Sequence, residues 1–331
     1  MTRDRILEIL WENADRYLSG EKLAESLNLS RAAVWKGIEQ LRKEGYEIES
    51  VTRRGYMLCS RSDVLSAEGL ARHLRDGRIR PQVYASIGST NTALKALAAE
   101  GAEEGLALVA GEQTAGRGRM GRSFFSPPDS GVYFSLLLRP ELPAEQVTGV
   151  TACAAVAVAE TIEELSGLET QIKWVNDVLI GGRKVCGILS EGSLDVESGM
   201  MNYVVVGIGI NTRPPAEDFP EELRGVAGAV FGEERVPELR CRLAAGVLDR
   251  LMDYSGRLGD PALFEGYRRR SLVLGREVTL LSPGKEPERA LVLDLERDFA
   301  LRVRLSDGSE KRVSSGEVSL RVKNEDGKQG L

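Results

Sequence analysis

Two short segments carry the residues of this chain that could handle negatively charged substrates. The segment Gly116–Arg122 contains three glycines and three arginines, and the segment Lys173–Asp177 is followed closely by Lys184. Glycine lets a backbone pass close to a ligand, and the forked guanidinium of arginine matches carboxylate and phosphate groups. Together the segments predict a site that holds two anions at once, such as a carboxylate and a nucleotide phosphate.

The glycine spacing of the first segment also satisfies the dinucleotide-binding pattern GxGxxG. That pattern requires a strand before it and a helix directly after it. The apolar run Leu106–Ala110 supplies the strand, but Pro127 and Pro128 follow the loop and argue against a helix. A nicotinamide- or flavin-binding fold is therefore disfavoured. A solvated basic surface loop is the plain alternative to a binding loop.

The histidine content of the chain limits which catalytic mechanisms are possible. The only histidine, His73, lies in a charged helical stretch, and we interpret it as a surface residue. Serine–histidine triads, zinc hydrolases and histidine general bases all depend on that residue type. The chemistry must therefore rest on lysine, arginine, aspartate, asparagine and backbone donors.

The amino-acid composition limits the class of protein and the cell compartment to be expected. The 331 residues allow two or three domains, and an apolar content of 42% allows a sizeable core. The formal net charge of −6 gives no sign of nucleic-acid binding, so any basic patch must be local. The four cysteines show neither metal nor disulfide spacing, and we find neither a signal peptide nor a membrane span. We expect a cytoplasmic protein.

Residues 1–62 have the pattern of a winged helix-turn-helix domain. Apolar spacing predicts a first helix from Ile6 to Leu18, a short helix over Glu21–Leu27, and a helix capped by Ser30. A hairpin follows over residues 46–58. Small and basic side chains gather on the third helix and at the hairpin tip.

These side chains predict DNA binding, because small residues let a helix approach bases while basic residues contact phosphates. The DNA-binding residues we expect are Ser30, Arg31, Ala32, Trp35, Lys36, Lys43, Arg53 and Arg54. A winged helix that serves protein interaction or structure alone is the alternative.

Residues 63–272 mix helical and strand patterns. The helices are expected at 66 onward, 89–99, 144–165, 237–258 and 261–270. The strands are expected at 82–86, 106–112 and 132–138, with consecutive strands over 171–209. Runs of strands with helices outside them predict an α+β domain built on a mixed sheet. The proline-bearing segment Thr212–Gly232 is a loop that either orders over a ligand or is a plain surface connection.

Residues 273–323 change to short alternating strands separated by turn residues, which predicts a small β-barrel. Its strands are expected at 278–281, 290–294, 301–305 and 311–313. The remaining residues, 324–331, form a tail.

In this order and spacing, the motifs resemble those of the biotin–protein ligase family, specifically the bifunctional members that also repress the biotin operon. The motifs are Ser89–Asn91, Gln113, Gly116–Arg122, Lys173–Asp177, Arg183–Leu189, Gly207–Asn211 and the recognition segment Ser30–Lys36. The resemblance covers nearly the whole chain. It implies an N-terminal winged helix-turn-helix, a ligase domain with the mixed sheet shared by biotin ligases and class II aminoacyl-tRNA synthetases, and a C-terminal Src-homology-3-like barrel.

The resemblance also implies a reaction in two steps. Biotin and ATP, with Mg²⁺, give biotinyl-5′-AMP and pyrophosphate, and biotin then passes to a lysine of the biotin carboxyl carrier protein of acetyl-CoA carboxylase. The adenylate would act as co-repressor at operator DNA, with a homodimer formed when the adenylate is bound. No metal site fixed by the protein alone is implied.

Site residues follow from the same resemblance. Lys184 would bridge carboxylate and α-phosphate, Arg117 and Arg119 would hold the phosphate, and Asp177 would orient a lysine or a metal. The biotin-binding set is Ser89, Thr90, Asn91, Gln113, Gly116, Arg117, Gly118, Arg119, Phe124, Lys184, Gly187, Gly207 and Gly209. The nucleotide-binding set is Arg117, Arg119, Arg122, Lys173, Asn176, Lys184 and Asn211.

Several of these residues have simpler interpretations. Ser89 is also a good helix N-cap, Gly207 and Gly209 could mark strand bulges, and Trp174 is more typical of a core. The chain departs from the family pattern at Val175, where proline is common.

Two further positions depart from the pattern. Phe124 stands where the family often has tryptophan, and Met120 stands where it often has a basic residue.

Two alternative functions stay open, a lipoate–protein ligase and a regulator that senses a small acid without catalysis.

Overall fold

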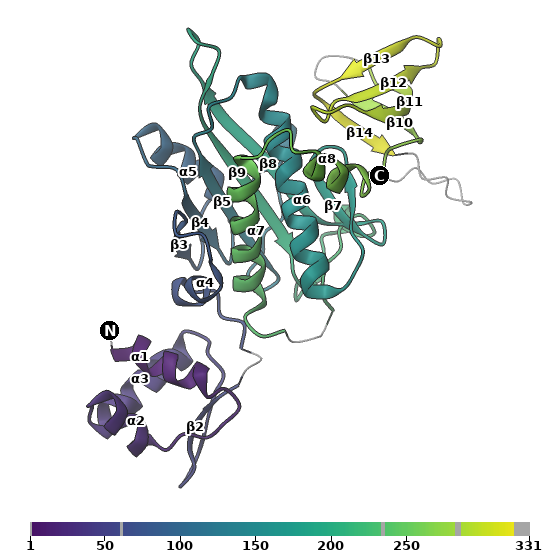
Figure 1. Ribbon diagram of the computed structural model, residues 1–331. Coiled ribbons are helices and arrows are strands. Elements are labelled where there is room, and N and C mark those ends of the chain that lie inside the picture. Colours follow the sequence, from purple (N-terminus) through teal and green to yellow (C-terminus); the bar gives the residue numbers. More distant parts are fainter. Residues whose placement is uncertain (1, 60–61, 233–235, 282–285, 321–331) are drawn as a thin grey trace. The chain divides into compact units, whose positions relative to one another are not determined.

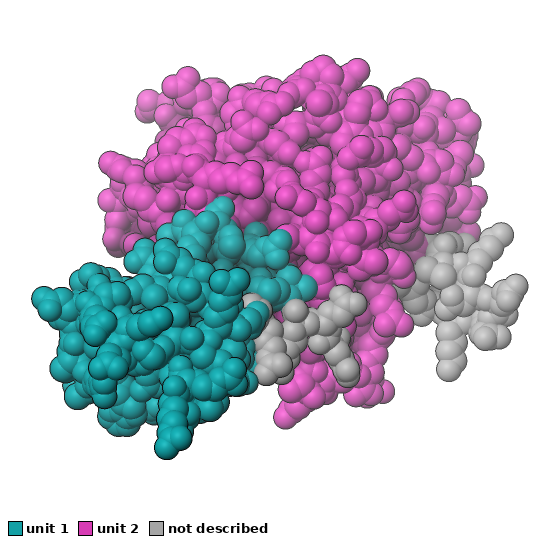
Figure 2. Space-filling view, turned by 60° about the horizontal axis from the view of Figure 1, so that its bottom comes forward, with its two compact units in different colours: residues 1–73, 233–242 teal, residues 74–232, 243–331 magenta. Residues whose placement is uncertain are grey.

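The computed structural model describes residues 2–59, 62–232, 236–281 and 286–320 (Figure 1). The chain divides into two compact units, residues 1–73 with 233–242, and residues 74–232 with 243–331 (Figure 2). The expected tail at 324–331 lies outside the described residues. Among the described residues, no helix is long and apolar enough to cross a membrane.

The first unit contains a three-helix bundle with a two-stranded hairpin. Its elements are α1 (Thr2–Glu12), α2 (Gly20–Leu27), α3 (Arg31–Lys43), β1 (Ile48–Val51), β2 (Gly55–Leu58) and α4 (Ala67–His73). The N-cap prediction for α3 is confirmed, since Ser30 Oγ accepts a hydrogen bond from the backbone N–H of Ala33 at 3.1 Å. Ile6, Leu23 and Ile38 share one buried core, which fixes α3 against the other two helices.

The predicted extent of the first helix is wrong. Helix α1 ends at Glu12, and Asp15 adopts a left-handed backbone conformation with φ of 63° that no α-helix accommodates. Leu18 pairs instead with Tyr56 of β2 through two backbone hydrogen bonds of 2.8 and 2.9 Å. A tertiary strand pairing thus overrides the apolar spacing of this segment.

The second unit is built on a seven-stranded mixed sheet in the order β3-β4-β5-β9-β8-β7-β6. Its strands are β3 (Arg80–Tyr84), β4 (Leu106–Ala110), β5 (Gly131–Leu138), β6 (Gln171–Lys173), β7 (Asp177–Ile180), β8 (Arg183–Leu194) and β9 (Met201–Asn211). Only the β3–β4 pair is parallel among these strand pairs. The prediction of a mixed sheet with helices packed on it is confirmed.

Helices cover both faces of this sheet. They are α5 (Thr90–Ala99), α6 (Val147–Ser166), α7 (Leu239–Ser255) and α8 (Pro261–Arg268). Leu94 of α5 packs on Leu137 and Val205, whereas Thr151 of α6 donates a hydrogen bond to Ser190 on β8. Because side chains alternate along a strand and Val205 pairs with the neighbour of Ser190, α5 and α6 lie on opposite faces.

Helices α6 and α7 run side by side on their face of the sheet (Figure 1). The middle of α6 is made of small residues that are buried on all sides, which lets it lie close to both the sheet and α7. This packing leaves the opposite face, with α5 and the strands β8 and β9, to form the site.

The C-terminal part of the second unit is a five-stranded antiparallel sheet in the order β13-β12-β11-β10-β14. Its strands are β10 (Glu277–Leu281), β11 (Glu288–Leu295), β12 (Leu301–Leu305), β13 (Glu310–Val313) and β14 (Glu317–Leu320). The four expected strands are present, and β14 is a fifth. Trp174 is 2% exposed and donates its indole N–H to the Phe299 carbonyl, so the core interpretation of Trp174 is confirmed.

A partly buried ion pair joins α6 to the end of α8. The guanidinium of Arg270, a residue that is 6% exposed, donates two hydrogen bonds to Glu163, which also accepts from Thr170. Burial raises the pKa of Glu163, but the hydrogen bonds from Arg270 and Thr170 outweigh it and lower that pKa from 4.5 to about 2. The folded state therefore favours the ionised carboxylate.

We predict that Glu163→Gln destabilises the protein by about 1–3 kcal/mol near neutral pH, because Arg270 loses its charged partner. A carboxyl with a lowered pKa stabilises the fold above its unfolded pKa, and this contribution is lost as the pH falls toward the folded value of about 2. The difference in free energy of unfolding between wild type and variant should shrink from pH 6 to pH 3. Urea denaturation at several pH values measures it, and a difference independent of pH would contradict the assignment.

Candidate active site

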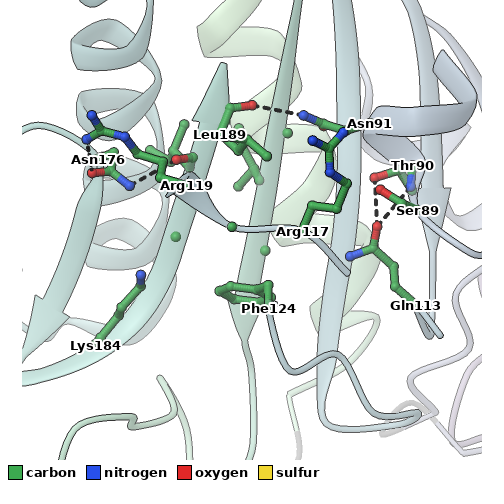
Figure 3. A pocket seen from close by; sticks show the side chains of 16 residues that line it. Ser89, Thr90, Asn91, Gln113, Arg117, Arg119, Phe124, Asn176, Lys184 and Leu189 are labelled. Atoms are coloured by element: carbon green, nitrogen blue, oxygen red, sulfur yellow. Dashed lines mark hydrogen bonds between the residues drawn. The ribbon is translucent and has the colours of Figure 1, made fainter. Parts of the chain in front are cut away.

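A polar pocket opens on the α5 face of the central sheet (Figure 3). It is lined by Ser89, Thr90, Asn91, Gln113, Arg117, Gly118, Arg119, Phe124, Asn176, Lys184, Gly187, Ile188, Leu189, Gly207, Ile208 and Gly209. Most of these residues come from the start of α5, the arginine loop and the strands β8 and β9, while Gln113, Phe124 and Asn176 come from connecting segments. Segments that lie about a hundred residues apart in sequence therefore meet in one site.

The start of α5 provides one wall of buried hydroxyls and amides. Ser89 caps the helix by accepting from the Thr92 N–H at 3.4 Å, so its capping interpretation is confirmed. Gln113 Oε1 accepts from both the backbone N–H and the hydroxyl of Thr90, and its Nε2 donates to Ser126. The wall offers donors and acceptors to a neutral polar group.

Asn91 is fixed in orientation by a residue that the sequence did not single out. Ser135, which is fully buried on β5, donates to Asn91 Oδ1 at 2.6 Å. Asn91 Nδ2 then donates to the Leu189 carbonyl and to Glu191, each at 3.1 Å. Serine in an apolar strand carries no sequence signal of its own, since only the fold places it under the pocket.

Three glycines of the sheet give the pocket its depth. A Cβ on Gly207 would lie 1.9 Å from Asn91 Oδ1, and one on Gly209 would lie 2.4 Å from the Phe124 ring. A Cβ on Gly187 would lie 2.9 Å from the same ring. Gly207 and Gly209 keep unbroken register with β5 and β8, so the bulge interpretation is wrong.

The arginine loop is a tight turn whose cations already have acceptors. Met120 takes a left-handed conformation with φ of 53°, which lets Gly118 and Arg122 close a 2.7 Å backbone hydrogen bond. Arg117 contacts Glu191 at 3.2 Å, while Arg119 donates to Asn176 at 2.9 Å and to the Gly316 carbonyl at 2.7 Å. The loop therefore has a defined geometry.

Lys184 lies at the start of β8, on the opposite side of the pocket from Gln113 (Figure 3). Its ammonium lies 2.7 Å from the Asp177 carboxylate, with which it forms an ion pair. Its backbone N–H donates to the Val226 carbonyl, and its carbonyl accepts from the Gly228 N–H. The segment Thr212–Gly232 thus holds the backbone of Lys184 in place.

A second cavity adjoins the first and is richer in charge. It is lined by Gly118, Arg119, Arg122, Ser123, Phe124, Lys173, Trp174, Asn176, Asp177, Lys184, Glu317 and Val318. Burial lowers the pKa of Lys173, and the carboxylate of Asp177 opposes that effect. Arg122 pairs with Glu317 at 2.9 Å. Lys184 and Arg119 line both cavities, which places cations where the two cavities adjoin.

Two of the expected site residues line neither cavity. Gly116 lies behind Phe124, where a Cβ would come within 2.4 Å of the Phe124 carbonyl oxygen. Asn211, at the end of β9, donates to the Gly228 carbonyl at 3.0 Å. Both positions support the pocket from outside. Sequence reasoning missed Ser135 and Glu191, which contact Asn91 of the pocket, and Glu317, which lines the second cavity.

The eight residues expected to bind DNA are all exposed in the first unit. Trp35 is 57% exposed on α3, and Arg31 reaches Glu21 at 2.6 Å. Arg53 and Arg54 lie at the turn between β1 and β2, where Arg54 stacks on the Tyr17 ring. His73 is partly exposed and lies 3.0 Å from Glu238, so it is a paired residue with no place in the pocket.

A helix-turn-helix in one unit and a cation-lined pocket on a mixed sheet in the other define a DNA-binding protein with an enzyme-like ligand site. Models of three families match the chain: an HTH domain over 2–57, the biotin/lipoate A/B protein ligase family over 83–211, and the biotin protein ligase C-terminal domain over 273–321. Along the chain, the three matches come in the same order as the helix-turn-helix, the central mixed sheet and the C-terminal sheet.

Individual relatives agree with the family models. The bifunctional ligase/repressor BirA of Bacillus subtilis (strain 168) is 41% identical over 227 residues, which are 68% of this chain and 69% of that protein. The BirA of Escherichia coli (strain K12) is 30% identical over 313 residues, 92% of each chain. The structure of biotin protein ligase from Aquifex aeolicus in complex with biotin and ATP matches with a TM-score of 0.60 and 29% identity, covering 73% of this chain and 98% of that chain.

The chain therefore belongs to the family of bifunctional biotin ligases and repressors: it is an ATP-dependent biotin–protein ligase that carries the helix-turn-helix of a transcriptional repressor.

We predict that Gly209→Ala weakens biotin binding at least about tenfold, because the new methyl group displaces the Phe124 ring and overpacking costs about 1–3 kcal/mol. Isothermal titration calorimetry with biotin measures the change. Gly88→Ala is the matched control, since a Cβ at Gly88, next to Ser89, meets nothing within 4 Å. Equal biotin affinity in the two variants would contradict this account of Gly209.

Proposed function

We propose that the two adjoining cavities hold biotin and ATP so that the biotin carboxylate meets the α-phosphate beside Lys184. The observation that carries this proposal is the convergence of Arg117, Arg119 and Lys184, from separate segments, on the pocket that also contains Thr90 and Gln113. Two anions repel each other unless positive groups offset their charge at the point of contact.

Biotin occupies the first cavity. Its ureido group both donates and accepts hydrogen bonds, as do the hydroxyls and amides of Ser89, Thr90, Asn91 and Gln113. The Phe124 ring, which stacks edge-on against Tyr133, covers the apolar ring of the ligand. The close backbone of Gly187, Gly207 and Gly209 forms the floor.

The nucleotide phosphates occupy the second cavity, held by Arg119, Arg122, Lys173 and Lys184. Mg²⁺ would accompany ATP. Within the described residues no group of three or more His, Cys, Asp or Glu side chains could hold a metal ion. One or two carboxylates with phosphate oxygens suffice for this ion, and Asp177 and Glu317 line the cavity. Bound there, Mg²⁺ would offset charge on the phosphates.

In the first step a biotin carboxylate oxygen attacks the α-phosphorus, forms the acyl–phosphate bond of biotinyl-5′-AMP and releases pyrophosphate. In the second step the ε-amine of a carrier lysine attacks the acyl carbon, forms an amide, releases AMP and gives up a proton. Lys184 and Arg119 hold the charge of both transition states. The acceptor is the biotin carboxyl carrier protein of acetyl-CoA carboxylase.

We predict that Lys184→Ala lowers adenylate formation by about two orders of magnitude or more, the scale for removing one pre-organised charge. Single-turnover formation of biotinyl-5′-AMP from biotin, ATP and Mg²⁺ measures this loss. Lys311→Ala is the control, because Lys311 pairs with Glu288 on the C-terminal sheet and lines neither cavity. Near-normal adenylation by Lys184→Ala would reject the assigned role.

Lipoate is the acid to exclude experimentally, because one matching family model covers biotin and lipoate ligases alike. The helix-turn-helix and the C-terminal domain favour biotin. Competition between the two acids for adenylation separates these substrates. A regulator without catalysis would show no exchange of pyrophosphate into ATP when biotin is present.

The first unit serves repression, with biotinyl-5′-AMP as co-repressor and a homodimer bound to a two-fold operator. The exposed set of Ser30, Arg31, Ala32, Trp35, Lys36, Lys43, Arg53 and Arg54 forms its DNA-binding surface. Edge strand β3 is where a second copy could add to the central sheet, because the outer side of β6 is already hydrogen-bonded to residues 270–272. Sedimentation with and without adenylate reports on the dimer.

We predict that replacing both Arg53 and Arg54 by alanine weakens operator binding and lowers the slope of log Kobs against log salt by about two, because each arginine neutralises one phosphate. Fluorescence anisotropy at several salt concentrations measures this slope. Arg5→Ala, an exposed position on α1, is the control and should leave the slope unchanged. An unchanged slope in the double variant would exclude the hairpin tip from phosphate contact.

The finer architecture follows the same family. The five C-terminal strands form a small Src-homology-3-like barrel, supported by their alternation of buried and exposed residues and by the match to the C-terminal ligase domain. The domain limits are 1–62, 63–272 and 273–323. Four buried cysteines without disulfide spacing fit a reducing compartment such as the cytoplasm.

A further inference from the structure

The carboxylate of Glu191 lies at a position where the proposed chemistry disfavours negative charge. Glu191 on β8 has a side chain that is 17% exposed, and it lies beside a pocket that we assign to two anionic substrates. A negative charge near a carboxylate and a phosphate weakens the binding of both unless it serves another purpose. Its contacts indicate that purpose.

Three donors from two segments meet at Glu191. Lys95, one turn after Asn91 on α5, reaches Glu191 Oε1 at 2.8 Å, and Arg117 Nη1 reaches the same oxygen at 3.2 Å. Asn91 Nδ2 donates to Oε2 at 3.1 Å. Burial alone raises the pKa of Glu191, but the hydrogen bonds from Lys95 and Asn91 and the nearby positive charges lower it, so the carboxylate stays ionised.

Lys95, Glu191 and Arg117 together carry a net positive charge. The Glu191 carboxylate therefore leaves this group attractive to the anionic substrates. Within the described part of the chain, Arg117 forms its side-chain hydrogen bonds to Glu191 through Nη1 alone. Its Nε and Nη2 therefore keep their donors for a ligand. Figure 3 shows the Arg117 guanidinium turned toward Asn91 in the pocket.

We propose that Glu191 is a positioning residue for adenylation: it holds one arm of Arg117 so that the other donors face the substrate anions, while Lys95 balances its charge. This inference rests on the proposed function, because it takes Arg117 as a ligand of those anions. Pre-organisation of a flexible guanidinium removes an entropy cost that the adenylation transition state would otherwise bear.

The competing explanation is that Glu191 only ties α5 to β8 through Lys95 and Asn91. The two explanations differ in which neighbour transmits the effect. If Glu191 acts through Arg117, replacing Glu191 slows adenylation only while Arg117 is present. Replacing Lys95 then has little effect, because the contact between Glu191 and Arg117 stays in place. If Glu191 is a structural tie, the loss of Lys95 is as harmful as the loss of Glu191, whatever residue occupies position 117.

A double-mutant cycle decides between them. The full-length wild type, Glu191→Gln, Arg117→Ala and the double variant are compared by single-turnover adenylate formation at saturating biotin, ATP and Mg²⁺. We expect Glu191→Gln to slow the step about tenfold in the wild-type background and less than about twofold in the Arg117→Ala background.

Two controls separate positioning from stability. Lys95→Met should slow adenylation less than about threefold, since Arg117 keeps its partner. Glu163→Gln removes a comparable ion pair outside both cavities and should lower stability without slowing the step. Thermal unfolding of every variant identifies any loss of folded protein.

The outcomes are distinguishable. Additive effects of the two substitutions, or a Lys95→Met effect equal to that of Glu191→Gln, would overturn the positioning role while leaving the proposed function intact. If Arg117→Ala itself adenylates at the wild-type rate, the assigned role of Arg117 fails first, and the role of Glu191 fails with it.

Discussion

The proposed site depends on one electrostatic constraint: if two anions are to come within bonding distance, positive charge has to be assembled before they arrive. The chain meets this constraint by giving three cations of the site a carboxylate each. Lys184 has Asp177, Arg117 has Glu191, and Arg122 has Glu317. A long basic side chain held in this way has already lost much of its conformational freedom, so less is lost when a substrate binds.

The central sheet supplies the rigid frame on which these charges are arranged. Strands β8 and β9 place glycine where side chains would otherwise fill the pocket, and α5 presents its capped start against them. Helices on the opposite face bury the apolar side of the same strands. Binding residues thus lie on elements fixed by the core, and the arginine loop is tied to them through Glu191 and Asn176.

The C-terminal sheet belongs to the same arrangement. The Gly316 carbonyl accepts from Arg119, and Glu317 pairs with Arg122, so the start of β14 and the residue before it provide acceptors for two of the three loop arginines. Trp174, which follows Lys173 in the motif, donates its indole N–H to the carbonyl of Phe299 in the C-terminal domain. The match to a biotin ligase C-terminal domain therefore concerns a part of the chain that contacts the arginine loop directly.

The sequence by itself determined the family, the order of domains, the helix caps and most of the residues of the pocket. Residue type and spacing sufficed there, because Ser30 and Ser89 cap helices through local bonds and the arginine loop has its own pattern of glycines. Only the tertiary structure decided that Leu18 pairs with a strand and that Ser135 lies beneath Asn91. It also decided that Glu191 meets Arg117 across more than seventy residues of chain. Such contacts depend on strand register and on which face a side chain takes, and no local spacing encodes either.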